Sequence, residues 1–163
     1  LQIMGEKKGW QYLDQLHQNI ALYTHSGSKP AKMAGRAEYP IGISFGYRGL
    51  YQKITREEPV ETYFPVEGSG WEIEVNALIN KKKIKKEAKI FLDWAISNKA
   101  MLAYSKNSAI IAAKGNYKIP AGFPKNPFNQ IINNDFQWAA KNQKRIINKW
   151  TNRYDKKSEP KFK

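Results

Sequence analysis

Apolar residues recur with two different spacings near the start of the chain, and this limits the folds that the chain can adopt. Trp10, Leu13 and Leu16 recur at helical spacing and share one face of a predicted helix. Residues 20–24 and 41–45 are short and rich in β-branched and aromatic residues, which is typical of strands. A short helix is predicted between them. The order is typical of a βαβ unit, so we expect an α/β fold.

A polar stretch that ends at Pro59 is the best candidate for a domain boundary. We therefore predict a first part over residues 1–57 and a second part over residues 58–163. The later apolar pattern predicts further elements. They are strands over 60–64 and 71–79, and helices over 84–96, through Met101 and Tyr104, and over 136–154.

Composition excludes several classes of site and of protein. The 163 residues are 41% apolar and include no Cys, which rules out disulfides and cysteine-ligated zinc. No apolar run approaches the roughly 20 residues that a membrane helix needs. The sequence begins at Leu1 without a signal-peptide pattern, and we expect a fragment or a processed chain.

The formal charge of +14 raises the question of nucleic-acid binding. Its densest run, residues 81–86, reads KKKIKK, and such runs are usually solvated faces of helices. A basic nucleic-acid-binding module is therefore an alternative reading, and a steep loss of affinity with salt would favour it.

Two turns are rich in groups that can donate hydrogen bonds. Residues 24–35 read THSGSKPAKMAG, in which a Ser can cap a helix, Gly27 allows close backbone approach and Pro30 is suited to the first helical turn. The same donors, with Lys29, would also suit an anion. Residues 68–70 read Gly-Ser-Gly and can likewise present backbone N–H groups. Two such turns are what a ligand cleft between two lobes needs.

Three stretches carry a resemblance to a known family: residues 9–49, residues 64–79 and residues 88–101. Together they are similar to the C-terminal half of ABC-transporter substrate-binding proteins of the iron(III) or 2-aminoethylphosphonate type. The resemblance implies a type II periplasmic-binding-protein fold, in which two α/β lobes close over a solute. Residues 1–57 would be the latter part of the second lobe, and residues 58–163 would be the crossover strand and the return into the first lobe.

The resemblance also implies which residues bind the solute. Ser26, Gly27 and Ser28 would hold its anionic or polar head, and Glu67, Ser69 and Trp71 would face it from the other lobe. Iron-binding relatives have two adjacent tyrosines where this chain has Gly46 and Tyr47, so one phenolate ligand is absent. Tyr47 with the neighbouring Arg48 offers too few anionic oxygens for Fe(III), whereas a guanidinium suits a phosphonate or phosphate.

We therefore expect the solute-binding component of an ABC importer, which would deliver a small anionic organic solute to a membrane permease. Its location would be periplasmic or anchored outside the cell surface. A ferric-iron-binding protein of the same fold is a further alternative. No catalytic motif is present in the sequence, and we expect no enzyme activity, cofactor, metal or nucleic-acid partner. Self-association of the fragment is expected, because truncation would leave strand edges open.

Overall fold

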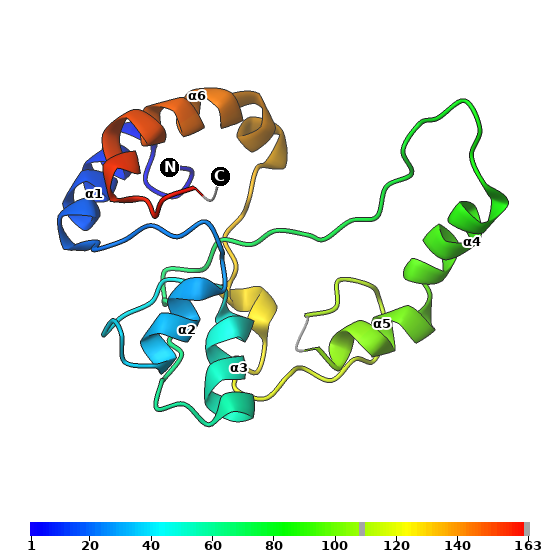
Figure 1. Ribbon diagram of the computed structural model, residues 1–163. Helices are drawn as coiled ribbons and strands as arrows, with labels where there is room; N and C mark the ends of the chain where they lie inside the picture. Colours follow the sequence, from blue (N-terminus) through cyan, green and yellow to red (C-terminus); the bar gives the residue numbers. More distant parts are fainter. Residues whose placement is uncertain (108–109, 162–163) are drawn as a thin grey trace.

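The computed structural model describes residues 1–107 and 110–161, and helices are its main regular elements. The α-helices are α1 (Glu6–Asn19), α2 (Lys29–Gly35), α3 (Gly46–Arg56), α4 (Lys86–Ala95), α5 (Asn98–Ser105) and α6 (Phe136–Tyr154). Two short 3-10 helices are η1 (Pro127–Gln130) and η2 (Asp155–Lys157). The helices lie in pairs, α1 beside α6, α2 beside α3 and α4 beside α5, and extended segments join the pairs (Figure 1).

The expected α/β architecture is wrong. Over residues 1–107 and 110–161, β-pairing is limited to isolated bridges, Tyr23 with Ser158 and Ser69 with Ile131, and no sheet forms. The chain therefore does not have the type II periplasmic-binding-protein fold. The predicted strands 41–45, 60–64 and 71–79 are extended but have no neighbouring strand. Strand propensity acts locally, whereas a sheet needs a partner strand that satisfies the backbone groups.

Helices α1 and α6 run parallel, and ionic contacts hold them in register (Figure 1). Glu6 receives a two-pronged contact from Arg145, and Asp14 receives one from Arg153 at 3.0 and 3.1 Å. Each pair is separated by 139 residues, so the contacts keep the same register two helical turns apart. Acidic side chains of α1 thus meet basic side chains of α6.

Aromatic rings fill the space between α1 and α6. Trp10 is 4% exposed, and its ring centroid lies 6.4 Å from that of Tyr154, which is 2% exposed. The Lys149 ammonium lies 4.7 Å from the Trp10 ring centroid, and the Tyr154 hydroxyl donates to Asp14 at 2.7 Å. The His17 ring lies beside them, tilted by 42° and 5.0 Å from the Tyr154 ring. We call this aromatic cluster, together with the ion pairs beside it, the seam between α1 and α6.

Helices α2 and α3 form a second packed unit with segments that follow them in the chain. Ala31 and Leu50 are buried, and the Leu50 side chain closes against Gly122. The Phe64 ring lies against Gly46 at the start of α3 and 5.3 Å from the ring of Phe123. The segment that contains Gly122 and Phe123 therefore covers α3.

The α4–α5 pair is thinly packed. Ala95 and Ala100 are fully buried where the two helices meet, and the Ser97 hydroxyl caps α5 by accepting a hydrogen bond from the N–H of Ala100. Phe91 and Trp94 nevertheless remain 61% and 42% exposed. Helices long and apolar enough to cross a bilayer are absent from the described part of the chain.

Candidate anion-binding loop

Residues 24–29, which are the loop before α2 and the first residue of that helix, are held against the segment that leads into α3. Ser44 donates its hydroxyl to the carbonyl of Gly27 at 2.5 Å. The Phe45 ring lies so close to Gly27 that an added Cβ would sit 2.6 Å from a ring carbon. A residue other than glycine would displace that ring, so close approach explains this glycine.

The two serines of the loop face solvent. The Ser26 and Ser28 hydroxyls hydrogen-bond to each other at 3.1 Å, and Ser26 is exposed. Ser28 is the N-cap residue of α2, and Pro30 lies within the first turn, as expected. Within the described residues, however, the Ser28 hydroxyl makes no capping bond to that turn. It therefore has acceptor and donor capacity left for a ligand.

A carboxylate from the end of the chain already occupies the loop. The N–H of His25 donates to Glu159 at 2.6 Å, and the Lys29 ammonium contacts the other oxygen of the same carboxylate. The His25 ring also donates to the Glu159 carbonyl at 2.9 Å. The bridge between Tyr23 and Ser158 brings this terminal segment alongside the loop. The loop therefore holds an anion in the folded chain.

Charge accounts for the state of this carboxyl group. The hydrogen bond from Lys29, followed by the N–H of His25, lowers the pKa of Glu159 below its ordinary value of 4.5. The carboxylate is thus favoured in its ionised form. An anionic group of the right shape would meet the same donors.

Tyr47 and Arg48 belong to the first turn of α3 and are half-buried. The Arg48 guanidinium lies 4.7 Å from the Tyr47 ring centroid, and the Tyr47 ring lies 5.9 Å from that of Phe45. Because Phe45 also contacts Gly27, the loop and the start of α3 are neighbours. The structure therefore brings Ser26, Gly27, Ser28, Tyr47 and Arg48 into one region.

The second predicted turn lies against a different part of the chain. The N–H of Ser69 donates to the carbonyl of Gln130 at 2.6 Å, and the Trp71 indole donates to that of Ile132 at 2.8 Å. The Trp71 ring packs edge-on against Phe136, and Glu67 is exposed. This turn is thus fixed by η1 and the start of α6, and the backbone groups of Ser69 are already engaged.

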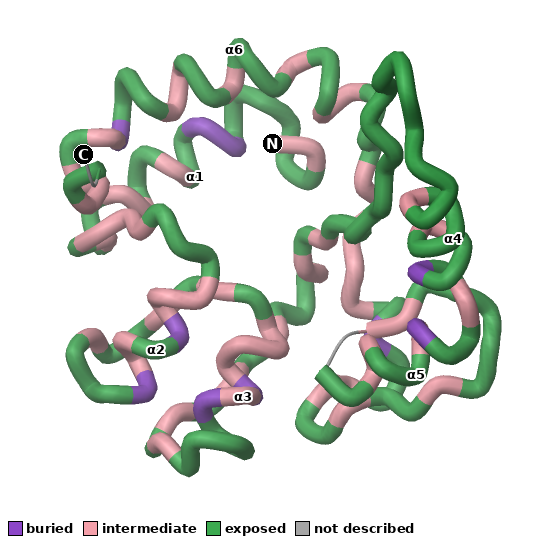
Figure 2. The backbone as a smooth tube through the Cα atoms, turned by 45° about the vertical axis from the view of Figure 1, so that its right-hand side comes forward, coloured by how far each residue is buried: buried purple, intermediate pink, exposed green. Residues whose placement is uncertain are grey.

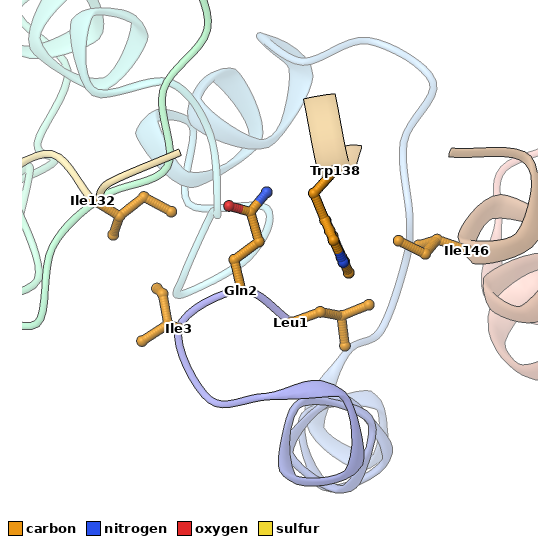
Figure 3. Close-up of a pocket in the computed structure, with 6 residues that line it drawn as sticks. All are labelled: Leu1, Gln2, Ile3, Ile132, Trp138 and Ile146. Carbon is orange, nitrogen blue, oxygen red and sulfur yellow. The ribbon is translucent and has the colours of Figure 1, made fainter. Parts of the chain in front are cut away.

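An open hollow of about 270 Å³ lies beyond this turn (Figure 3). Its lining is mainly apolar and comes from the N-terminal arm, the segment before α6, and α6 itself: Leu1, Gln2, Ile3, Ile132, Trp138 and Ile146. The Gln2 amide is already engaged within the chain, since it donates to Asn134 at 3.0 Å and accepts from the N–H of Asp135 at 2.7 Å. The hollow offers few polar groups to orient a ligand.

Within residues 1–107 and 110–161, no cluster of three or more His, Asp or Glu side chains is placed to bind a metal ion. Tyr47 carries the Arg48 cation over its ring, which disfavours a trivalent cation there.

Sequence reasoning missed Glu159 as part of the loop. The residue stands in a basic tail, 153–163, and lies 134 positions from His25 and 130 positions from Lys29. An acidic residue in a tail dominated by lysines offers no local signal of such a contact. Lys29 was visible as a donor beside the serines.

Comparison with known proteins gives one informative match. The chain is 31% identical over 155 residues to a protein of Haemophilus influenzae strain KW20 that is named only as uncharacterized. The match covers 92% of this chain and 44% of the relative, so the chain spans less than half of that protein's length. Neither a family model nor a solved structure matches the chain.

The carboxylates predict how stability depends on pH. Hydrogen bonds from Arg145 and then Trp10 lower the pKa of Glu6, and those from Tyr154 and then Arg153 lower that of Asp14. As pH falls, the unfolded chain therefore takes up protons before the folded chain does. These groups stabilise the fold fully above about pH 4.5, and the contribution is lost as pH falls through the lowered pKa values.

We expect the melting temperature to fall between about pH 5 and pH 3. The double variant Glu6→Gln with Asp14→Asn should melt lower at neutral pH and change less on acidification. Glu74→Gln, which alters an exposed carboxyl in an extended segment, is the control and should keep the wild-type slope. Thermal melts followed by circular dichroism measure both. An unchanged slope in the double variant would contradict this assignment.

Proposed function

We propose that this chain binds a small organic anion that carries a phosphate or phosphonate group, as the solute-binding component of an importer. The observation that carries the proposal is the Glu159 carboxylate on the loop, between the N–H of His25 and the ammonium of Lys29. A phosphate head needs the same donors, a backbone N–H and a cation. The loop is thus already built to hold negative charge.

Neighbouring side chains support a larger head group than a carboxylate. The Ser26 and Ser28 hydroxyls belong to the same loop, between His25 and Lys29 in the sequence, and bond only to each other among the side chains of the described residues. Arg48 lies over the ring of Tyr47, which neighbours Phe45 beside the loop, and its planar guanidinium can pair with two phosphate oxygens. Hydroxyls, an ammonium and a guanidinium together suit a dianion better than a single carboxylate.

The importer role is supported by the resemblance of residues 9–49, 64–79 and 88–101 to substrate-binding proteins of ABC transporters. It implies a membrane permease as partner, an extracytoplasmic location and binding without catalysis. The proposal does not include the lobe architecture, which the structure contradicts. It rests on the loop and the first turn of α3.

Removing the negative charge of Glu159 tests the proposal. In Glu159→Gln, the loop loses its internal competitor and the repulsion between that carboxylate and a bound dianion. Hydrogen bonds to charged groups contribute about 1.5–3 kcal/mol, so affinity for glycerol phosphate should rise about tenfold or more. Isothermal titration calorimetry measures the change, with uncharged glycerol as the ligand control.

The matched control is Glu61→Gln. It removes a carboxylate that pairs with Lys53 and changes the net charge equally, but it lies outside the loop. It should leave affinity near that of the wild type. If both variants bind glycerol phosphate equally well, the gain comes from net charge and the loop is not the site. If neither variant nor the wild type binds it, the proposed function fails.

A further inference from the structure

The folded chain exposes far more surface than its mass predicts. Its accessible area is 13,414 Å² at 18.8 kDa. A compact monomer of that mass exposes about 8,300 Å² by the usual size scaling. The excess of about 5,000 Å² has the scale of the area buried in permanent interfaces between chains, which is about 2,000–5,000 Å². An excess of this size indicates that further polypeptide buries part of this surface.

Much of the exposed apolar surface lies on extended segments, and Figure 2 shows how much of the chain is exposed. Ile41, Ile43 and Phe45 alternate along one segment and are 80%, 66% and 54% exposed. Ile73 and Val75 alternate in the same way in residues 71–79 and are 52% and 76% exposed. Alternation of this kind buries one side of a strand when a sheet forms around it.

The backbone of these segments is open as well. Among the described residues, the main-chain N–H and C=O groups of 41–44 and 72–84 form no hydrogen bond with another main-chain group. An extended segment with free donors and acceptors is a template for strand addition. Side-chain pattern and backbone therefore point to the same kind of partner, an extended polypeptide.

We infer that residues 41–45 and 71–79 pair, as strands, with additional polypeptide of the kind that the Haemophilus relative carries outside the matched region. More than half of that relative lies outside the match, so it holds enough polypeptide to cover an area of this size. The charge of this chain argues against a second copy as the cover. At +14, two copies would bring large like charges together.

Hydrogen–deuterium exchange on two proteins tests this inference. In the 163-residue chain alone, peptides over 41–45 and 71–79 should exchange at nearly the rate of unfolded peptide. In the full-length Haemophilus protein, the aligned peptides should exchange at least about 100-fold more slowly, as paired strands do. Peptides from α6 and from its aligned segment serve as the reference, because α6 is helical without the cover.

Each other outcome overturns the inference. Fast exchange of the aligned peptides in the Haemophilus protein would show that its extra polypeptide does not cover them. Protection in the isolated chain that grows with protein concentration would identify a second copy as the partner. Protection that is independent of concentration would show pairing within the chain itself. None of these outcomes depends on whether the loop at 24–29 binds an anion.

Discussion

Replacing Trp10 with Ala should lower the free energy of unfolding by about 3–5 kcal/mol, which is the usual cost of removing a large aromatic side chain from a packed site. The side chain is 4% exposed, packs against Tyr154 and lies beneath the Lys149 ammonium. Its indole N–H also donates to Glu6 at 3.3 Å. The substitution thus removes the centre of the contact between α1 and α6. Urea unfolding followed by helical circular dichroism measures the loss.

Tyr12→Ala is the matched control for this prediction. It removes an aromatic ring from the same helix, but Tyr12 is 50% exposed. The expected loss is therefore below about 1 kcal/mol. Equal losses in the two variants would mean that the effect comes from helix propensity, and that the seam between α1 and α6 is not a core.

Replacing both Ser26 and Ser28 with Ala should weaken binding of glycerol phosphate by about tenfold or more for each serine, because in the proposed complex each hydroxyl would donate to a charged oxygen. The stability of the free protein should hardly change. The Ser28 hydroxyl does not cap α2 in the described chain, so the roughly 1 kcal/mol that a lost cap costs is not expected here. Calorimetric titration beside thermal melting separates the two effects.

Ser105→Ala provides the control for the double variant. Ser105 lies at the end of α5 and donates to the carbonyl of Leu102, so the same chemical change is made away from the loop. Binding should be unaffected in this variant. Unchanged affinity in the Ser26/Ser28 variant would remove both serines from the site.

Most of the helices were predictable because their signals are local. Apolar residues at helical spacing predicted α1, α4 and α6, and the bounds of α6, Phe136–Tyr154, agree with the predicted range. Side-chain caps support two of the helix starts, with Ser97 before α5 and Asp135 before α6. Helical spacing and a capping residue can both be recognised within a few turns of consecutive sequence.

Helix α3 was missed, and the reason lies in its glycines. Gly46 and Gly49 lower helix propensity within the segment. In the structure, Phe64 lies against Gly46 and Thr62 lies against Gly49, where larger side chains would collide. Contacts with a segment distant in the sequence thus offset the unfavourable local preference, and no local pattern reveals such contacts.

For the strands, the local preference was correct but the predicted sheet does not form. Residues 41–45 and 71–79 have strand composition and are extended, yet a sheet also requires a neighbouring strand. Whether that neighbour exists depends on polypeptide that the local pattern does not describe. The predicted division of the chain into residues 1–57 and 58–163 stays a prediction.

The candidate site was predictable in part. The donors of residues 24–29 were visible because serine, glycine and lysine before a helix are a local pattern. Glu159, which occupies them, comes from the far end of the chain. The placement of Glu67, Ser69 and Trp71 against η1 and α6 depends on equally distant contacts.

The central claim is that the loop at 24–29 binds a phosphorylated anion, and a two-dimensional amide NMR titration with glycerol phosphate tests it most directly. We predict saturable shifts of the His25 to Lys29 and Tyr47 to Arg48 amides, and none with uncharged glycerol. The exposed lysines of residues 81–86 provide an internal control for general attraction of anions to a chain of charge +14. Shifts that are absent at the loop, or largest at 81–86, would contradict the claim.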